Sequence, residues 1–145
     1  MNAFNAMLAR FQPLVLSIFR IMTGLLLFQF GVAKLFKFPA GTAFDKVEPF
    51  SLYWCAGCIE LVLGGLLILG LCTRIVAFIL CGEMAFAYFI THFPRGFIPL
   101  LNDGELAIMF CFACLYICCA GGGPYGFDGM RKASVTAPEL MRQRG

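Results

Sequence analysis

The chain has 145 residues, of which 61% are hydrophobic and only 13% are charged. A soluble domain of this size needs a charged surface that so few charges cannot provide, so the composition indicates an integral membrane protein. The formal net charge is +3 and the basic residues lie mainly in loops and tails. This pattern fits membrane topology better than nucleic-acid binding, and we expect no nucleic-acid partner.

Four apolar segments approach the roughly 20 residues that a bilayer core requires, at about 14–36, 53–71, 75–92 and 104–120. The first is too long for a signal-peptide core and is interpreted as an uncleaved signal anchor. The last is short and should start within the outer interface. Because lipid cannot satisfy backbone polar groups, these segments predict an all-α, four-transmembrane-helix antiparallel bundle over residues 1–130, followed by a polar tail at 131–145.

Basic residues near the segment ends predict the orientation. One side would carry Arg10, Arg74, Arg131, Lys132, Arg142 and Arg144, and the other Lys34, Lys37, Lys46 and Arg95. The first side should be cytoplasmic, so both termini are expected there. Residues 72–74 form a very short turn, which predicts a hairpin, whereas 37–52 and 93–103 should lie on the outer interface.

Helical spacing groups small and charged residues on two faces. Arg20, Gly24, Leu27, Gly31 and Lys34 form one stripe, and Tyr53, Gly57, Glu60 and Gly64 form another. Small residues allow helix backbones to approach closely in lipid, so both stripes should face neighbouring helices and carry their charges inward.

Polar side chains from four segments reach one outer layer of the predicted bundle. The ligand-binding candidates are Lys34, Glu60, His92, Asn102 and Glu105. Ionisable residues inside spans are costly and usually face an interior or a cavity, which favours a shared pocket open to the periplasm. The alternative is a structural Lys34–Glu60 pair, with His92 and Glu105 wetted at the interface.

Two other features have structural interpretations. Asn102 with Glu105 three residues later resembles a capping box that starts the fourth helix. Arg20 and Glu83 have matching depths, so they form either a buried ion pair or, for Glu83, a contact with a partner subunit. Both alternatives stay open.

Eight cysteines in a short chain can indicate a disulfide scaffold, but most of them lie inside apolar runs, where a thiol is first a small packing residue. Ala107, Cys111, Cys114, Cys118 and Gly121 share one stripe, which predicts a packing seam. Cys55 and Cys58 form a CxxC pair at a helix start, where a redox role is a second interpretation. We expect no metal site, and "GGGP" after the last span is a helix stop.

The motifs "FRIMTGLLLFQFGVAKLF", "IELVLGGLLILGLCTRIVA", "HF", "NDGELA" and "GGGPYGFDGM" together resemble the DoxX family of small bacterial membrane proteins, across roughly residues 15–130. The matching positions are Arg20, Lys34, Glu60, Arg74, His92, Asn102 and Glu105. The resemblance implies a multi-pass protein of the bacterial inner (plasma) membrane, linked to redox assemblies and to quinone.

We therefore expect a non-catalytic or redox-linked, quinone-associated subunit, with no intrinsic cofactor and quinone as the possible ligand. Its partners would be the lipid bilayer and other membrane-complex subunits or further copies of itself. The alternatives are a purely structural subunit of a large membrane assembly, and a small-molecule carrier, which would require oligomerisation because no inverted repeat is visible.

Overall fold

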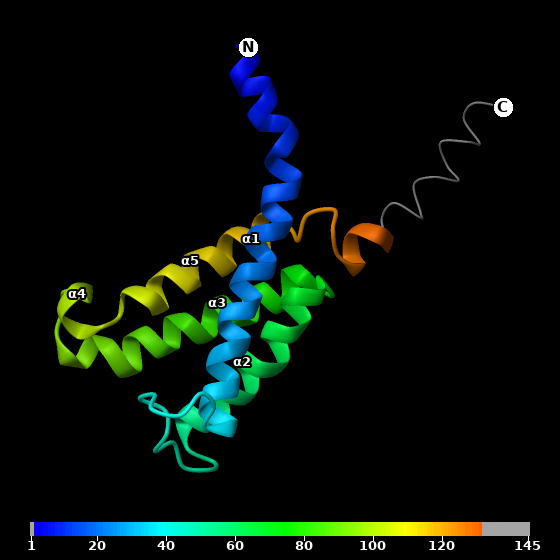
Figure 1. The fold of residues 1–145 in the computed structure, drawn as a ribbon. Coiled ribbons are helices and arrows are strands. Elements are labelled where there is room, and N and C mark those ends of the chain that lie inside the picture. The colour runs from blue at the N-terminus through cyan, green and yellow to red at the C-terminus, as the bar shows by residue number, and fades with distance from the viewer. Residues whose placement is uncertain (1, 132–145) are drawn as a thin grey trace.

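The computed structural model describes residues 2–131, and within that range the chain contains helices and no strands (Figure 1). The all-α prediction is therefore confirmed there, and the polar tail from residue 132 lies outside the described residues. The elements are α1 (Ala3–Phe36), α2 (Leu52–Leu69), α3 (Thr73–Ala87), a π-helical turn η1 (Tyr88–His92), a 3-10 turn η2 (Phe93–Arg95), α4 (Pro99–Asn102) and α5 (Glu105–Ala120).

In the described part of the chain, three helical segments are long and apolar enough to cross a membrane, namely Ala3–Phe36, Leu52–Leu69 and Thr73–Arg95. The apolar helix α5 has 16 residues. At 1.5 Å per residue it spans about 24 Å, less than a bilayer core of about 30 Å. α1 starts at Ala3 rather than near residue 14, because residues 3–12 are mostly good helix formers.

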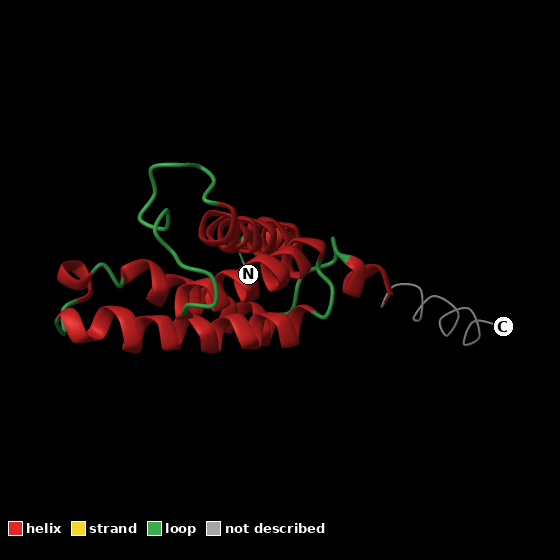
Figure 2. Ribbon diagram, turned by 90° about the horizontal axis from the view of Figure 1, so that it is seen from below, coloured by secondary structure: helices red, strands yellow, loops and turns green. Residues whose placement is uncertain are grey.

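The helices form two antiparallel pairs, α1 with α2 and α3 with α5 (Figures 1 and 2). The pairs meet at the turn of residues 70–72 and diverge away from it, so that α2 and α3 are the two arms of a V. The loop of residues 37–51 and the segment η2–α4 both lie at the open end of the V. The predicted hairpin is confirmed, and its splayed arms leave space between them.

Glycines allow α1 and α2 to pack with their backbones nearly in contact. A Cβ atom on Gly31 would lie 2.5 Å from the Leu61 backbone nitrogen, and one on Gly64 would lie 2.7 Å from the Phe28 nitrogen. Neither position has room for a side chain. Arg20, Gly24, Leu27, Gly31 and Lys34 are all buried, as are Gly57, Glu60 and Gly64. The two predicted stripes therefore face the neighbouring helices, except at Tyr53, which is 40% exposed.

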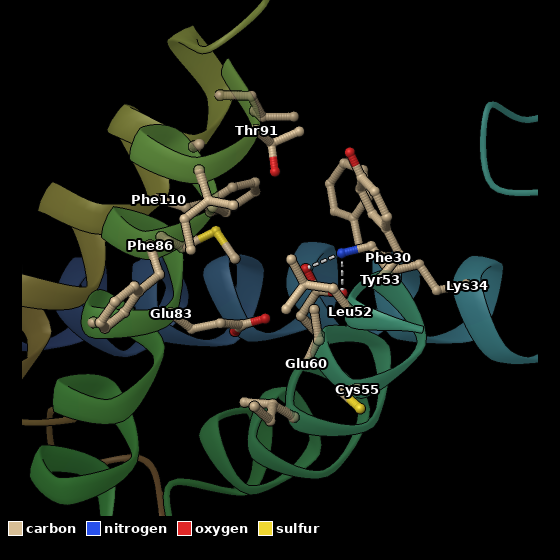
Figure 3. A pocket seen from close by; sticks show the side chains of 18 of the residues that line it. Phe30, Lys34, Leu52, Tyr53, Cys55, Glu60, Glu83, Phe86, Thr91 and Phe110 are labelled. Atoms are coloured by element: carbon tan, nitrogen blue, oxygen red, sulfur yellow. Dashed lines mark hydrogen bonds and ion pairs between the residues drawn. The ribbon is translucent and has the colours of Figure 1, made fainter. Parts of the chain in front are cut away.

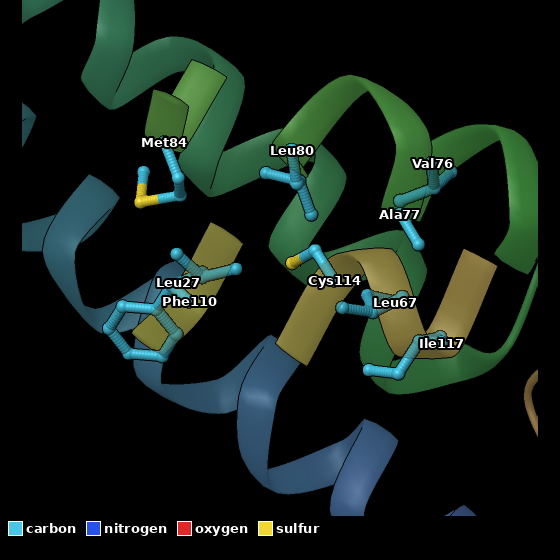
Figure 4. Packing of buried hydrophobic residues seen from close by; sticks show 9 residues of the cluster. All are labelled: Leu27, Leu67, Val76, Ala77, Leu80, Met84, Phe110, Cys114 and Ile117. Carbon is cyan, nitrogen blue, oxygen red and sulfur yellow. The ribbon is translucent and has the colours of Figure 1, made fainter. Parts of the chain in front are cut away.

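A buried cluster joins the four long helices near the turn (Figure 4). It consists of Leu27, Leu67, Val76, Ala77, Leu80, Met84, Phe110, Cys114 and Ile117. Cys111 and Cys118 pack against it, and the Cys81 and Cys111 sulfurs lie 3.7 Å apart. The predicted small-residue seam on α5 is confirmed as packing, which in lipid depends on close van der Waals contact.

Arg20 fastens the closed end of the V. Its guanidinium donates hydrogen bonds to the carbonyls of Leu67 (2.5 Å), Ile68 (2.7 Å) and Gly122 (2.9 Å), and also to that of Tyr125. Two of these carbonyls are in the last turn of α2, where a helix leaves carbonyls without backbone partners, although the Leu67 carbonyl also accepts from the Gly70 nitrogen (3.2 Å). Of the two alternatives for Arg20 and Glu83, the buried ion pair is wrong: Arg20 donates to carbonyls, and neither Glu83 oxygen has a hydrogen-bond partner among the described residues.

Two further contacts cap helix ends at the same turn. Arg74 donates to the carbonyls of Cys118 (2.8 Å) and Cys119 (2.6 Å) at the end of α5. The Asp128 carboxylate accepts from the backbone nitrogens of Cys72 (3.1 Å) and Thr73 (2.7 Å) at the start of α3. The closed end is thus cross-linked by side chains, whereas the open end is where the helices separate.

Candidate functional site

A cavity of about 670 Å³ occupies the open end of the V. Its walls come from the first half of α2 and from α3 with η1, while α1 and α5 contribute Phe30, Lys34, Leu106, Ala107 and Phe110. The volume falls within the range of small-molecule sites, which is about 300–1,000 Å³. The lining is mainly apolar and aromatic, with a few ionisable groups.

Lys34 and Glu60 form a buried ion pair in this cavity (Figure 3). The Lys34 ammonium donates to both carboxylate oxygens of Glu60, at 2.6 and 2.7 Å, and the two residues are only 8% and 2% exposed. Gly57 makes room for the lysine, since a Cβ there would lie 2.8 Å from the Lys34 Cβ. The ammonium also lies 5.3 Å from the Phe44 ring centre. The predicted Lys34–Glu60 pair is confirmed.

Glu83 is the site residue that the sequence interpretation missed. Both of its carboxylate oxygens are buried, and neither has a hydrogen-bond partner among the described residues. The side chain lines the cavity and extends from α3 toward Glu60 (Figure 3). The available signal was an acid within an apolar span, which is a functional indicator regardless of its helical face.

His92 also lines the cavity, although ideal helical spacing places it nearly opposite Glu83. The π-helical turn of residues 88–92 explains the difference, because a wider turn rotates the following side chains relative to an α-helix. The His92 Nδ1 lies 2.9 Å from the Asn102 carbonyl oxygen, and its ring stacks on Tyr88. The histidine thus sits at the rim, held by neighbours on both sides.

The other two predicted ligand-binding residues do not line the cavity. Asn102 is fully buried, donates to the Gly96 carbonyl (2.7 Å) and accepts from the Gly104 nitrogen (2.8 Å). Glu105 is exposed at the start of α5. The predicted capping box is wrong: Asn102 ends α4, and the left-handed Asp103 (φ 57°) separates it from α5. Asn102 instead stabilises the turn between α4 and α5 with its side chain, and its own backbone carbonyl contacts His92.

The loop of residues 37–51 covers the Lys34 side of the cavity. Lys37 donates to the carbonyls of Val47 and Phe44 (3.2 Å), which places the Phe44 ring in the cavity wall. The Asp45 carboxylate accepts from the Gly41 nitrogen (2.7 Å), and this bond lowers the pKa of Asp45. The loop is therefore fastened by side-chain bonds at both of its halves.

Cys55 lines the cavity and is exposed, whereas Cys58 is half-buried; both are free thiols. A redox role for this pair stays a prediction. Within residues 2–131, no three histidine, cysteine, aspartate or glutamate side chains gather as metal ligands.

Membrane-length apolar helices around an internal cavity define a class, that of multi-pass helical membrane proteins. The DoxX family model matches residues 15–93, a range that contains Lys34, Glu60, Glu83 and His92. An uncharacterized protein of Haemophilus influenzae is 38% identical over 125 residues, which cover 83% of this chain and 93% of that protein. No solved structure matches the chain. The chain belongs to the DoxX family, as its motifs predicted.

Proposed function

We propose that this protein is a subunit of the bacterial inner membrane that binds a quinone ring in the cavity between α2 and α3. In this role it is a non-catalytic, redox-linked component of a larger membrane complex. The observation that carries the proposal is the cavity itself: a buried ammonium group in an aromatic enclosure whose mouth is lined by exposed apolar side chains.

The lining suits a planar ring with carbonyl oxygens. Phe30, Phe44 and Tyr53 supply aromatic faces and edges, which favour stacked or edge-on contact with another ring. An ammonium group has three donors, and Glu60 takes two of the Lys34 bonds, so one donor remains for a ligand carbonyl. Lys34 is thus the group that would orient the ring.

The mouth of the cavity suits an isoprenoid tail. Phe78, Phe86 and Ile90 line the cavity and are also 66%, 69% and 52% exposed. In a bilayer these side chains would contact acyl chains. A ligand would therefore enter from the membrane and leave its tail in the lipid, with no passage through water.

The proposed topology has four crossings with both termini in the cytoplasm. Residues 99–120, which comprise α4, its turn and α5, form the fourth crossing. Arg10 and Arg74 lie toward the closed end of the V, and Lys37 and Arg95 lie toward the open end. If the basic tail residues lie on the same side as Arg10 and Arg74, as the sequence predicts, the positive-inside rule favours a cytoplasmic closed end and a cavity in the periplasmic half.

The test is to purify the protein from bacterial membranes in a mild detergent, extract bound lipids and measure quinone per chain by chromatography. Native mass spectrometry of the same sample would identify partner subunits. Ala87→Phe, which places a ring in the cavity wall, should abolish the bound quinone. Val62→Phe, on an exposed part of α2 outside the cavity, is the matched control and should retain it. Equal quinone in both variants, or none in the wild type, would contradict the proposal.

A further inference from the structure

We infer that the cavity has a donor pole at Lys34 and an acceptor pole at Glu83, and that it prefers the reduced, hydroxyl-bearing form of its ring ligand over the quinone. This inference rests on the proposed quinone-binding function and adds the redox form that the site selects. It depends on Glu83, which the proposed function does not use.

Glu83 receives no hydrogen bond from residues 2–131. Its two oxygens are buried and have no hydrogen-bond partner among the described residues. A buried polar group without a partner is costly, and a charged one more so. The structure therefore contains an acceptor that a ligand can satisfy.

The other charged groups of the cavity, and His92, each lie against a neighbouring group. Lys34 directs two hydrogen bonds to Glu60. The His92 Nδ1 lies against the Asn102 carbonyl. Asp103 is exposed at the rim, 4.0 Å from Arg95. Because the charges of Lys34 and Glu60 compensate each other, the Glu83 carboxyl is the charged group of the cavity that a hydrogen-bond donor on a ligand would satisfy.

The two redox forms of a quinone differ in what they offer such a site. The oxidised ring carries two carbonyl oxygens, which only accept hydrogen bonds. The reduced ring carries two hydroxyls, and each can both donate and accept. A quinol can accept from Lys34 at one oxygen and donate to the ionised carboxylate of Glu83 at the other, whereas a quinone offers that carboxylate no donor.

With Glu83 ionised, the size of the preference follows from the value of one hydrogen bond to its carboxylate. Such a bond contributes enough to change the dissociation constant about tenfold or more. The quinol should therefore bind at least about tenfold more tightly than the quinone of the same ring.

The chain contains a single tryptophan, Trp54, which serves as the reporter. Its neighbours in sequence, Tyr53 and Cys55, line the cavity. A short-chain benzoquinone bound there should quench Trp54 fluorescence, and titration under anaerobic conditions gives its dissociation constant. Displacement of the quinone by the corresponding quinol gives the second constant, and the ratio of the two is the measured quantity.

The variant Glu83→Gln removes the charge and adds an amide donor that a quinone carbonyl can accept. The ratio should fall from about tenfold toward unity or invert in this variant. Glu48→Gln changes an exposed acid in the 37–51 loop and should keep the wild-type ratio. Circular dichroism and size-exclusion profiles show whether each variant is folded, and the wild-type ratio is informative without either variant.

Several results would overturn the inference. If the wild type binds both forms equally or prefers the quinone, the acceptor pole is refuted while the quinone-binding function stands. If Glu83→Gln keeps the wild-type ratio, Glu83 is not the selecting group. If tetraphenylphosphonium binds in a Glu83-dependent way and the quinol does not displace it, the acidic pole serves lipophilic cations. If the wild type binds neither ring, the proposed function and the inference fail together.

Discussion

Removing one member of the Lys34–Glu60 pair should destabilise the protein far more than removing both. The substitutions are Lys34→Met and Glu60→Gln, made singly and together. Both residues are almost fully buried and share two short hydrogen bonds, so each single change leaves its partner without compensation. Breaking a buried pair in this way costs about 3–5 kcal/mol, whereas replacing both members is often close to neutral.

The cavity also predicts an asymmetry between the two single variants. Lys34→Met leaves Glu60 and Glu83 as two carboxyls in one cavity with no ammonium group. Glu60→Gln keeps the Lys34 ammonium group in the same cavity as the Glu83 carboxyl, so one positive group still faces the remaining acid. Lys34→Met should therefore be the more destabilising change, at the upper end of the range of about 3–5 kcal/mol.

The assay is reversible unfolding in mixed micelles with increasing dodecyl sulfate, followed by far-ultraviolet circular dichroism. The free energies of unfolding of the four proteins form a double-mutant cycle. The double variant should lose less than about 2 kcal/mol, well below either single variant. Single losses below about 1 kcal/mol that simply add in the double variant would refute the description of a buried, mutually dependent pair.

Three further predictions concern the frame around the cavity. Gly31→Ala should destabilise the α1–α2 contact by at least about 1 kcal/mol in the same assay, because its Cβ would overlap the Leu61 backbone. Its matched control, Gly82→Ala, has open space and should be neutral or stabilising by up to about 1 kcal/mol. Arg20→Lys should lower the thermal midpoint by several degrees, because an ammonium group cannot reproduce the planar guanidinium that donates to several carbonyls at once. An unchanged thermal midpoint would contradict the role of Arg20 in holding the closed end together. The pKa of Asp45 is lowered, so its contribution to loop stability is present above the ordinary carboxyl pKa and is lost as pH falls through the lower, folded-state value. Hydrogen-exchange protection at the Gly41 amide should decline over that pH range, because Asp45 accepts its hydrogen bond. Asp45→Asn should remove this pH dependence.

Much of the frame was predictable because it follows helical periodicity. The stripes that contain Lys34 and Glu60 face inward as their spacing indicates, and the glycines beside them explain how α1 and α2 come close enough to bury the pair. An internal acid and an internal base on adjacent helices at similar depth have few alternatives to pairing in lipid.

The parts of the site that the sequence did not predict depend mainly on departures from regular α-helices. Glu83 and His92 line one cavity because a π-helical turn lies in the segment between them, and sequence spacing assumes a regular α-helix. Asn102 and Glu105 have the spacing of a capping box, but the left-handed Asp103 ends one helix before the next begins. Arg20 donates to carbonyls instead of pairing with Glu83. Two of these carbonyls, those of Gly122 and Tyr125, belong to the segment after α5, and helical spacing does not predict the position of that segment.

Photoaffinity labelling is the most direct test of the central claim, that the cavity between α2 and α3 receives a quinone ring from the membrane. Native membranes that contain the protein are irradiated with an azido-quinone, and the labelled peptides are mapped by mass spectrometry. The account predicts labels within residues 52–60 and 78–92, suppressed by unlabelled quinone and by Ala87→Phe but not by Val62→Phe. Labels confined to exposed residues outside the cavity, such as Val62 or Ile75, or labels that unlabelled quinone does not suppress, would contradict it.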